Sequence, residues 1–275
     1  MEINRQNIQE IIFKSRLNPD KDYGQNFLLE PTICQKIVDA LELKKSEEVL
    51  EIGPGIGSLT HFLSLVDGVK TTVVDIDVRM INFLKIIYQN NNIEIVENDI
   101  RKHDVRNYDK ILGNLPYNIT TETVNFLLLN ARKCQRMVLM CQLEALNHFF
   151  DITGKEYGPS SILVHLLGNI KKLFVVKAGS FYPVPKCQSV VFSIDINPTL
   201  DIHVIKKIYA LSKQLFLNRR KTIYNNLSHL LNDKENATKV LNSLNIPLNK
   251  RPEEILPEQY VKIYLELMKD EKDSQ

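Results

Sequence analysis

The sequence predicts an α/β protein with a seven-stranded, mostly parallel sheet, followed by a small all-helical region. Two patterns support this fold class. Up to about residue 197, short apolar runs alternate with stretches that repeat apolar residues at helical spacing, which is typical of a parallel sheet covered by helices. After that point only helical patterns remain. A chain of 275 residues is long enough for two domains, which we expect at 1–197 and 198–275.

Seven runs have the apolar, β-branched composition of strands. They are 47–53, 71–77, 92–99, 108–114, 136–142, 171–178 and 188–196. The Pro-rich segment 179–187 separates the last two and is too short for a crossover helix. We therefore expect these two strands to pair antiparallel at an edge of the sheet.

Helical spacing of apolar residues predicts three helices between the strands and four after them. The first three cover 58–66, 78–90 and 120–133, and the last four cover 204–216, 220–231, 236–244 and 257–269. The last four form the expected C-terminal domain.

The composition is ordinary for a globular protein, with 44% apolar and 25% charged residues. No apolar run approaches the length that spans a bilayer, and the N-terminus lacks the apolar core of a signal peptide. The four cysteines are scattered and the six histidines show no ligand spacing, so we expect a cytoplasmic protein without a metal site.

A glycine-rich turn follows the first predicted strand in "VLEIGPGIGSLT". Gly53, Gly55 and Gly57 follow Glu51 with the spacing G-x-G-x-G, which differs from the G-x-G-x-x-G of dinucleotide folds. Glycines at such a turn let the backbone approach a ligand closely, although a ligand-free turn has the same composition.

Acidic residues end the next two predicted strands. Asp75 and Asp77 lie eighteen and twenty residues after Gly57, where a carboxylate normally accepts hydrogen bonds from a ribose diol. Spacing alone does not decide between them. Asp99 ends the third strand at the same sheet edge and could accept a hydrogen bond from an adenine amino group. Each of these acids could instead cap a helix.

The fourth strand ends in "ILGNLPYNIT", which contains a rigid Asn-Leu-Pro-Tyr turn. The side-chain carbonyl of Asn114 and the main-chain carbonyl of Leu115, held by Pro116, can accept both N–H bonds of an exocyclic amine. Such contacts aim the nitrogen lone pair at an electrophile, and Tyr117 offers a flat face for an unstacked base. No general base is obvious, and none is required before transfer, because positioning and electrostatics can supply the rate enhancement.

A cluster of basic residues lies in the predicted C-terminal domain. Between residues 202 and 232 there is no Asp or Glu, and the basic residues are Lys206, Lys207, Lys213, Arg219, Arg220 and Lys221. Clustered positive charge is typical of a surface that binds a polyanion, although a solvated helix face has a similar composition.

These motifs together resemble the ribosomal RNA adenine dimethyltransferases of the KsgA type. The matching segments, in order, are "GQNFL" (24–28), "EIGPGIGSLT" (51–60), "NLPYNI" (114–119), "YGPSS" (157–161), "SFYPVPK" (180–186) and "RRKTIYNNL" (219–227). The resemblance covers nearly the whole chain. It implies a Rossmann-like class I methyltransferase domain that uses S-adenosyl-L-methionine, followed by a helical RNA-binding domain.

The resemblance also implies a role for individual residues. For the cofactor site it implies that Asn26 and Leu28 line the pocket, Gly53 contacts the methionine end, Asp75 binds the ribose, Asp99 reads the adenine and Asn114 completes the pocket. In the catalytic site, Asn114, Leu115 and Pro116 hold the target amine, while Tyr117 and Phe181 enclose its base. RNA binding falls to Arg219, Arg220 and Lys221.

The implied activity is N6,N6-dimethylation of two adjacent adenosines in the 3′-terminal hairpin of 16S ribosomal RNA, with a role in small-subunit biogenesis. The implied partner is this RNA in the small subunit or its precursor. The protein is implied to be a monomer that does not associate with a membrane. Three positions depart from the family pattern: Asp75 replaces a Glu, and Leu143 and His148 replace basic residues.

Three other functions fit parts of the sequence. The macrolide-resistance methyltransferases of 23S ribosomal RNA share the cofactor site, but Leu115 and the segment 219–227 argue against them. A ribosome-assembly factor that acts mainly by binding is a second alternative, and the intact Asn114, Pro116 and Tyr117 argue for catalysis instead. A DNA adenine methyltransferase would need a target-recognition domain that the sequence lacks.

Overall fold

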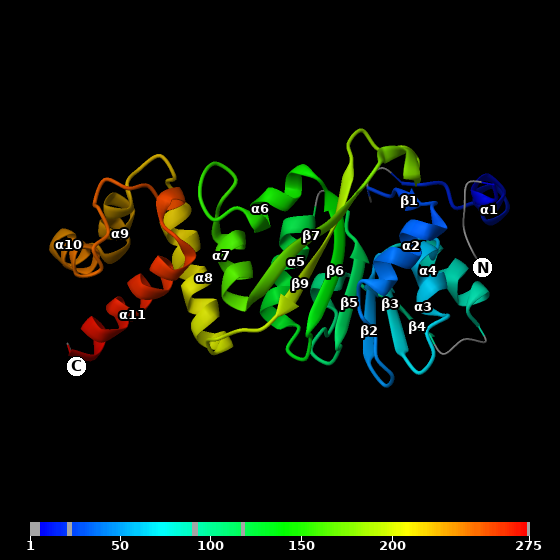
Figure 1. Cartoon of the computed structure of the whole chain (residues 1–275), viewed down its shortest axis with the longest axis horizontal. Coiled ribbons are helices and arrows are strands. Elements are labelled where there is room, and N and C mark those ends of the chain that lie inside the picture. Colours follow the sequence, from blue (N-terminus) through cyan, green and yellow to red (C-terminus); the bar gives the residue numbers. More distant parts are fainter. Residues whose placement is uncertain (1–5, 21–23, 90–92, 117–118, 274–275) are drawn as a thin grey trace. The chain divides into compact units, whose positions relative to one another are not determined.

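The computed structural model describes residues 6–20, 24–89, 93–116 and 119–273 of the chain (Figure 1). The chain divides into two compact units. The first contains Met1–Leu146 and Ile170–Ile196, and the second contains Asn147–Asn169 and Asn197–Gln275. No helix in the described ranges combines the length and apolar character needed to cross a bilayer.

A seven-stranded sheet forms the centre of the first unit and confirms the predicted fold class. Its strands, in spatial order, are β4 (Ile93–Glu97), β3 (Lys70–Asp75), β2 (Glu48–Ile52), β5 (Lys110–Asn114), β6 (Arg136–Gln142), β9 (Ser189–Ile196) and β7 (Gly168–Val176). The first five are parallel to one another, and β9 is antiparallel to β6. All seven predicted strands are present, and the last two lie side by side at one edge.

Among the described residues of this unit, five helices accompany the sheet, because each has an apolar face that must be buried. They are α1 (Ile8–Ser15), α2 (Pro31–Asp39), α3 (Ser58–Leu63), α4 (Val78–Ile87) and α5 (Thr120–Asn130). Side chains of α2 and α3 pack with Leu112 and Val138 of the central strands. Side chains of α1 and α4 pack in a second cluster with Val73 of β3.

The register of the parallel strands brings the ends of β2, β3 and β5 together. Ile52 pairs with Val74 on β3 and with Gly113 on β5. The residues that follow, including Asp75 and Asn114, therefore reach the carboxyl edge of the sheet at the same level. Open α/β sheets bind their ligands at this edge.

A second, two-stranded sheet was not predicted from strand composition. β1 (Phe27–Leu28) pairs antiparallel with β8 (Phe181–Tyr182), with Phe27 opposite Tyr182 and Leu28 opposite Phe181. Two-residue strands are too short to show a period of two, so only tertiary contacts identify them.

The second unit is helical. Its elements are α6 (Asn147–Phe150), α7 (Pro159–Leu167), α8 (Ile202–Phe216), α9 (Ile223–Leu231), α10 (Lys234–Ser243) and α11 (Pro257–Asp273). The four predicted C-terminal helices are thus present as α8 to α11. The predicted boundary at 197 assigned residues 147–169 to the first domain, whereas the structure groups them with these helices.

Burial explains why residues 147–169 belong to the second unit. Tyr157 and Ile162 are fully buried in a core with Ile208, Leu215 and other side chains of α8 to α11. The Tyr157 hydroxyl also donates a 2.9 Å hydrogen bond to the carbonyl oxygen of Ile255. A buried phenol needs such a partner, and Ile255, just before α11, provides it.

Candidate active site

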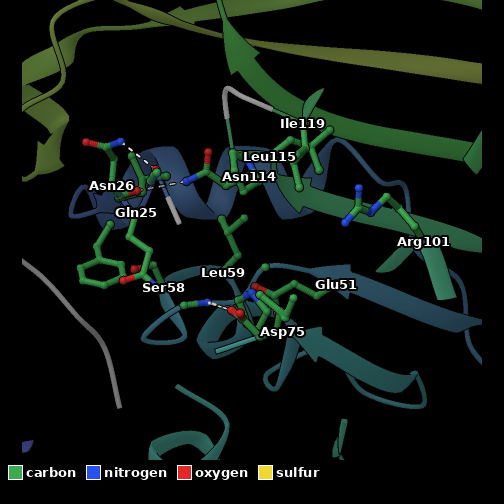
Figure 2. A pocket seen from close by; sticks show the side chains of 18 residues that line it. Gln25, Asn26, Glu51, Ser58, Leu59, Asp75, Arg101, Asn114, Leu115 and Ile119 are labelled. Atoms are coloured by element: carbon green, nitrogen blue, oxygen red, sulfur yellow. Dashed lines mark hydrogen bonds between the residues drawn. The ribbon is translucent and has the colours of Figure 1, made fainter. Parts of the chain in front are cut away.

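A pocket lies at the carboxyl edge of the sheet in the first unit (Figure 2). It is lined by Gly24, Gln25, Asn26, Phe27, Leu28, Glu51, Gly53, Pro54, Gly55, Ser58, Leu59, Asp75, Ile76, Arg101, Asn114, Leu115, Pro116 and Ile119. Figure 2 shows Asn26 and Asn114 on one side of the pocket and Glu51 with Asp75 on the other.

The glycine turn after β2 forms part of the pocket wall and requires its glycines. Gly57 precedes α3 with a φ of +92°, and a Cβ there would lie 2.8 Å from a methyl carbon of Leu84. Gly55 has a φ of +54°, and a Cβ there would lie 3.1 Å from the ring of Phe27. Both the backbone conformation and the space therefore exclude a side chain.

Glu51 is a buried acid in the pocket wall. Its side chain is 1% exposed, and one carboxylate oxygen accepts a 2.7 Å hydrogen bond from the Thr60 hydroxyl. Burial raises the pKa of Glu51 to about 8, because the charged form loses its hydration. The sequence placed Glu51 beside the glycine turn but could not predict its burial.

The structure distinguishes Asp75 from Asp77. Asp75 lines the pocket and accepts hydrogen bonds from the backbone N–H of Gly55 at 3.2 Å and of Asp77 at 2.9 Å. Burial raises the pKa of Asp75 above its usual value. Asp77 instead caps α4, where it accepts from the backbone N–H of Arg79 and forms a 2.6 Å ion pair with its guanidinium.

Asp99 lies outside the lining of the pocket as far as the described residues define it, and Arg101 takes a place there. The Arg101 guanidinium contacts the Asp99 carboxylate at 2.7 Å and the Glu122 carboxylate, on α5, at 3.0 Å. The hydrogen bond from Arg101 lowers the pKa of Asp99. Arg101 was not predicted, since a lone arginine after a strand has no motif that would indicate a role.

The turn after β5 brings three of its predicted residues to the pocket. Asn114, Leu115 and Pro116 all line it, and the Leu115 N–H donates a 3.0 Å hydrogen bond to the carbonyl oxygen of Met140. The Thr120 hydroxyl donates to the Pro116 carbonyl oxygen at 2.9 Å and ties the turn to α5. Tyr117, the fourth predicted residue, lies outside the described residues.

The segment 24–29, which we call the strap, lies against the pocket and reaches β5. The Nδ2 of Asn114 donates a 3.2 Å hydrogen bond to the main-chain carbonyl oxygen of Asn26 (Figure 2). Asn26 and Leu28, implied by the family resemblance, both line the pocket. Gln25 and Phe27 of the same strap also line it but were not predicted.

Phe181 lies in β8 with its side chain only 2% exposed, in the core cluster that also contains Leu28. It is outside the lining formed by the described residues. Enclosing a target base would require this ring to become exposed, so that role stays a prediction.

The predicted RNA-binding residues lie in the second unit. Arg219, Arg220 and Lys221 occupy a turn between α8 and α9, whereas a helix was predicted to begin at residue 220. Arg220 and Lys221 are exposed, whereas Arg219 donates a 3.2 Å hydrogen bond to the Gly154 carbonyl oxygen. His148, one of the departures from the family, lies 3.4 Å from the Glu156 carboxylate in this unit.

The pocket residues fit a nucleoside that carries a cationic amino-acid chain. Asp75 offers a carboxylate for hydroxyl groups, and Ile76, 52% exposed, offers an apolar surface for a base. Glu51 adds a second carboxylate that a nearby positive charge would stabilise in its ionised form. S-adenosyl-L-methionine has all three of these parts.

Known proteins resemble the chain over most of its length. A family model described as "Ribosomal RNA adenine dimethylase" matches residues 16–269. The chain is 35% identical over 258 residues to "Ribosomal RNA small subunit methyltransferase A" of Malacoplasma penetrans, with 92% of this chain and 93% of the relative covered. It is 34% identical over 256 residues to the protein of the same name from Mycoplasma mycoides, with 89% and 96% covered.

Solved structures show the same architecture. A dimethyladenosine transferase from Plasmodium falciparum superposes with a TM-score of 0.76 at 27% identity, covering 88% of this chain and 98% of that one. The 23S rRNA methyltransferase ErmE gives a TM-score of 0.68 at 23% identity, with 88% and 99% covered, and therefore shares the fold. With the family model matching nearly the whole sequence and these relatives agreeing in length, the chain belongs to the ribosomal RNA adenine dimethylase family.

Proposed function

We propose that the protein dimethylates N6 of adenosine in small-subunit (16S) ribosomal RNA, with S-adenosyl-L-methionine as methyl donor. One observation supports this most directly: the ends of β2, β3 and β5 bring Gly53, Asp75 and Asn114 to one pocket. The relatives named ribosomal RNA small subunit methyltransferase A support the choice of RNA. The two target adenosines are those of the 3′-terminal hairpin implied by the family resemblance.

Recognition of the target amine falls to the turn after β5. The Oδ1 of Asn114 and the main-chain carbonyl of Leu115 accept the two N–H bonds of the amine, so its lone pair points out of the ring plane. Pro116 keeps the turn rigid and Tyr117 stacks on the base. Catalysis then comes from positioning a neutral nucleophile rather than from a general base.

The cofactor supplies an electrophilic methyl group on a sulfonium. We assign its ribose to Asp75, whose two backbone hydrogen bonds keep the carboxylate in place. Its methionine end is assigned to the Gly53 turn, and the strap residues Asn26 and Leu28 cover it. Asp99 would accept a hydrogen bond from the adenine amino group while its carboxylate keeps the ion pair with Arg101.

The helical second unit binds RNA in this proposal, through Arg220 and Lys221 on the turn between α8 and α9. Phosphate contacts from exposed basic side chains gain from counterion release. We further propose that the protein acts as a monomer in the cytoplasm, where small subunits are assembled. Its four cysteines, Cys34, Cys134, Cys141 and Cys187, are scattered along the sequence, which suits a reducing compartment.

A methyl-transfer assay with labelled S-adenosyl-L-methionine tests the proposal. Unmethylated small subunits, large-subunit RNA and duplex DNA are compared, and the modified nucleoside is mapped. Dimethyladenosine only in small-subunit RNA is the expected result. Label in large-subunit RNA or DNA would contradict the substrate, and binding to small subunits without label would contradict the catalytic role.

A further inference from the structure

A hydrogen bond joins the strap to the turn after β5. The Nδ2 of Asn114 donates to the main-chain carbonyl of Asn26, 88 residues earlier in the sequence. In the primary amide of Asn114, Nδ2 and Oδ1 diverge from the planar Cγ and point in different directions. A donor contact to the strap therefore leaves Oδ1 directed away from the strap, as Figure 2 shows.

The rotation of this amide matters for the reaction proposed above. Only Oδ1 can accept a hydrogen bond from the target amine, since Nδ2 is a donor. If the amide turned over, it would present N–H groups to an N–H donor. The Asn26 carbonyl is an acceptor, so it favours the rotation that turns Nδ2 toward the strap and leaves Oδ1 available to the target amine.

Gln25 anchors the end of the strap that precedes Asn26. Its Nε2 donates a 2.8 Å hydrogen bond to the Asp77 carboxylate, and its Oε1 accepts a 2.9 Å bond from the Asp20 backbone N–H. Its own N–H donates to the Asp20 carbonyl oxygen at 3.2 Å. Both polar atoms of this amide and its backbone N–H are therefore engaged.

The partner of Gln25 is itself rigid. Asp77 is 3% exposed, caps α4 and forms an ion pair with Arg79. The other end of the strap is fixed by the pairing of β1 with β8 and by a 2.9 Å hydrogen bond from the Leu29 N–H to the Ser180 carbonyl oxygen. Asn26 lies between these two anchors.

We propose that Gln25 is a positioning residue for methyl transfer. By fixing the strap to Asp77, it places the Asn26 carbonyl where it orients the Asn114 amide, so cofactor binding and amine recognition share one element. The inference rests on the proposed function, because it assigns Asn114 the task of holding the amine.

Gln25→Ala is the direct test, with Gln35→Ala as a matched control. Gln35 is also a glutamine that bonds an aspartate, at 2.7 Å to Asp39, but it lies exposed on α2 outside the described lining of the pocket. Single-turnover methylation of small-subunit RNA is measured as a function of cofactor concentration, together with cofactor Kd and thermal unfolding.

For Gln25→Ala we expect the rate at saturating cofactor to fall about ten- to a hundred-fold, because small displacements of a positioning group cost this much. Gln35→Ala should match the wild type in rate. If Gln25→Ala changes only the cofactor Kd and keeps the saturating rate, the inference is wrong. An inactive wild type would instead contradict the proposed function.

A double-mutant cycle with Asp77→Ser tests the path of the effect. Serine still caps a helix but is too short to reach Gln25. If Gln25 acts through Asp77, the double variant should lose no more of the saturating rate than the more strongly affected single variant does. Additive losses would overturn the proposed connection. Thermal midpoints equal to that of the wild type would show that the loss of rate is not caused by general unfolding.

Discussion

Thr60 donates a 2.7 Å hydrogen bond to the carboxylate of Glu51, which is 1% exposed at the wall of the pocket. One hydroxyl does not replace the hydration that burial removes, so the pKa of Glu51 rises to about 8 from an ordinary value near 4.5. In the protein without cofactor, this acid is therefore mostly protonated at neutral pH.

This pKa makes stability depend on pH. Between about 4.5 and 8 the folded state keeps a proton on Glu51 that the unfolded chain has released, so rising pH favours unfolding by up to about 1.4 kcal/mol per pH unit. Glu51→Gln removes this dependence. We expect the difference between its thermal midpoint and that of the wild type, variant minus wild type, to increase from pH 5 to pH 8. A constant difference would show that Glu51 ionises normally.

Asn114→Ala should lower the rate of methyl transfer by more than about a hundred-fold, because the amine loses a positioned acceptor. Cofactor affinity should fall much less, by about ten-fold at most, since one hydrogen bond to the strap is removed. Single-turnover kinetics and calorimetry of cofactor binding measure the two effects. Equal losses would show that Asn114 serves only the cofactor site.

Asp75→Asn should weaken cofactor binding more than Asp99→Asn. Asp75 lines the pocket with a carboxylate held by two backbone N–H groups, whereas Asp99 is engaged by Arg101. Titration calorimetry with S-adenosyl-L-methionine compares the two variants. A larger loss for Asp99→Asn would move the main polar contact to the end of β4.

Arg220→Glu and Lys221→Glu should weaken RNA binding and reduce its salt slope by roughly one for each phosphate that is no longer neutralised. Arg219→Ala should act on stability instead, because Arg219 bonds the Gly154 carbonyl and lies 5.5 Å from the Phe216 ring. Filter binding over a range of salt and thermal unfolding separate these outcomes. An unchanged slope in both reversal variants would place the RNA surface elsewhere.

Asn226 supports the same basic turn from inside the second unit. Its Nδ2 lies within hydrogen-bonding distance of the carbonyl oxygens of Asn218 and Thr222, both at 3.2 Å, and its side chain is buried. Asn226→Ala should destabilise the protein by about 1–3 kcal/mol, since the buried Asn226 side chain and its hydrogen bonds to the turn are removed. Chemical denaturation measures this change, and Asn225→Ala, an exposed neighbour, is its control.

Residue patterns alone predicted much of the fold. The seven strands and the four C-terminal helices follow from apolar periodicity, which depends only on local geometry. The pair β1 and β8 could not be predicted this way, because two residues carry no period and their pairing joins positions about 155 residues apart. Residue patterns could not show that residues 147–169 pack with the C-terminal helices, because their partners, such as Ile255, are far away in sequence.

The sequence by itself determined the order of strands and helices, the glycine turn, and the acids Asp75 and Asp99 and the amide Asn114 near the ends of the three strands that follow it. Only the tertiary structure decided which acid enters the pocket, that Glu51 is buried, that Arg219 bonds within its own unit, and that the strap contacts Asn114. The physical reason is that periodicity and turn chemistry are local, whereas burial and hydrogen-bond partners depend on residues that the folded chain brings together.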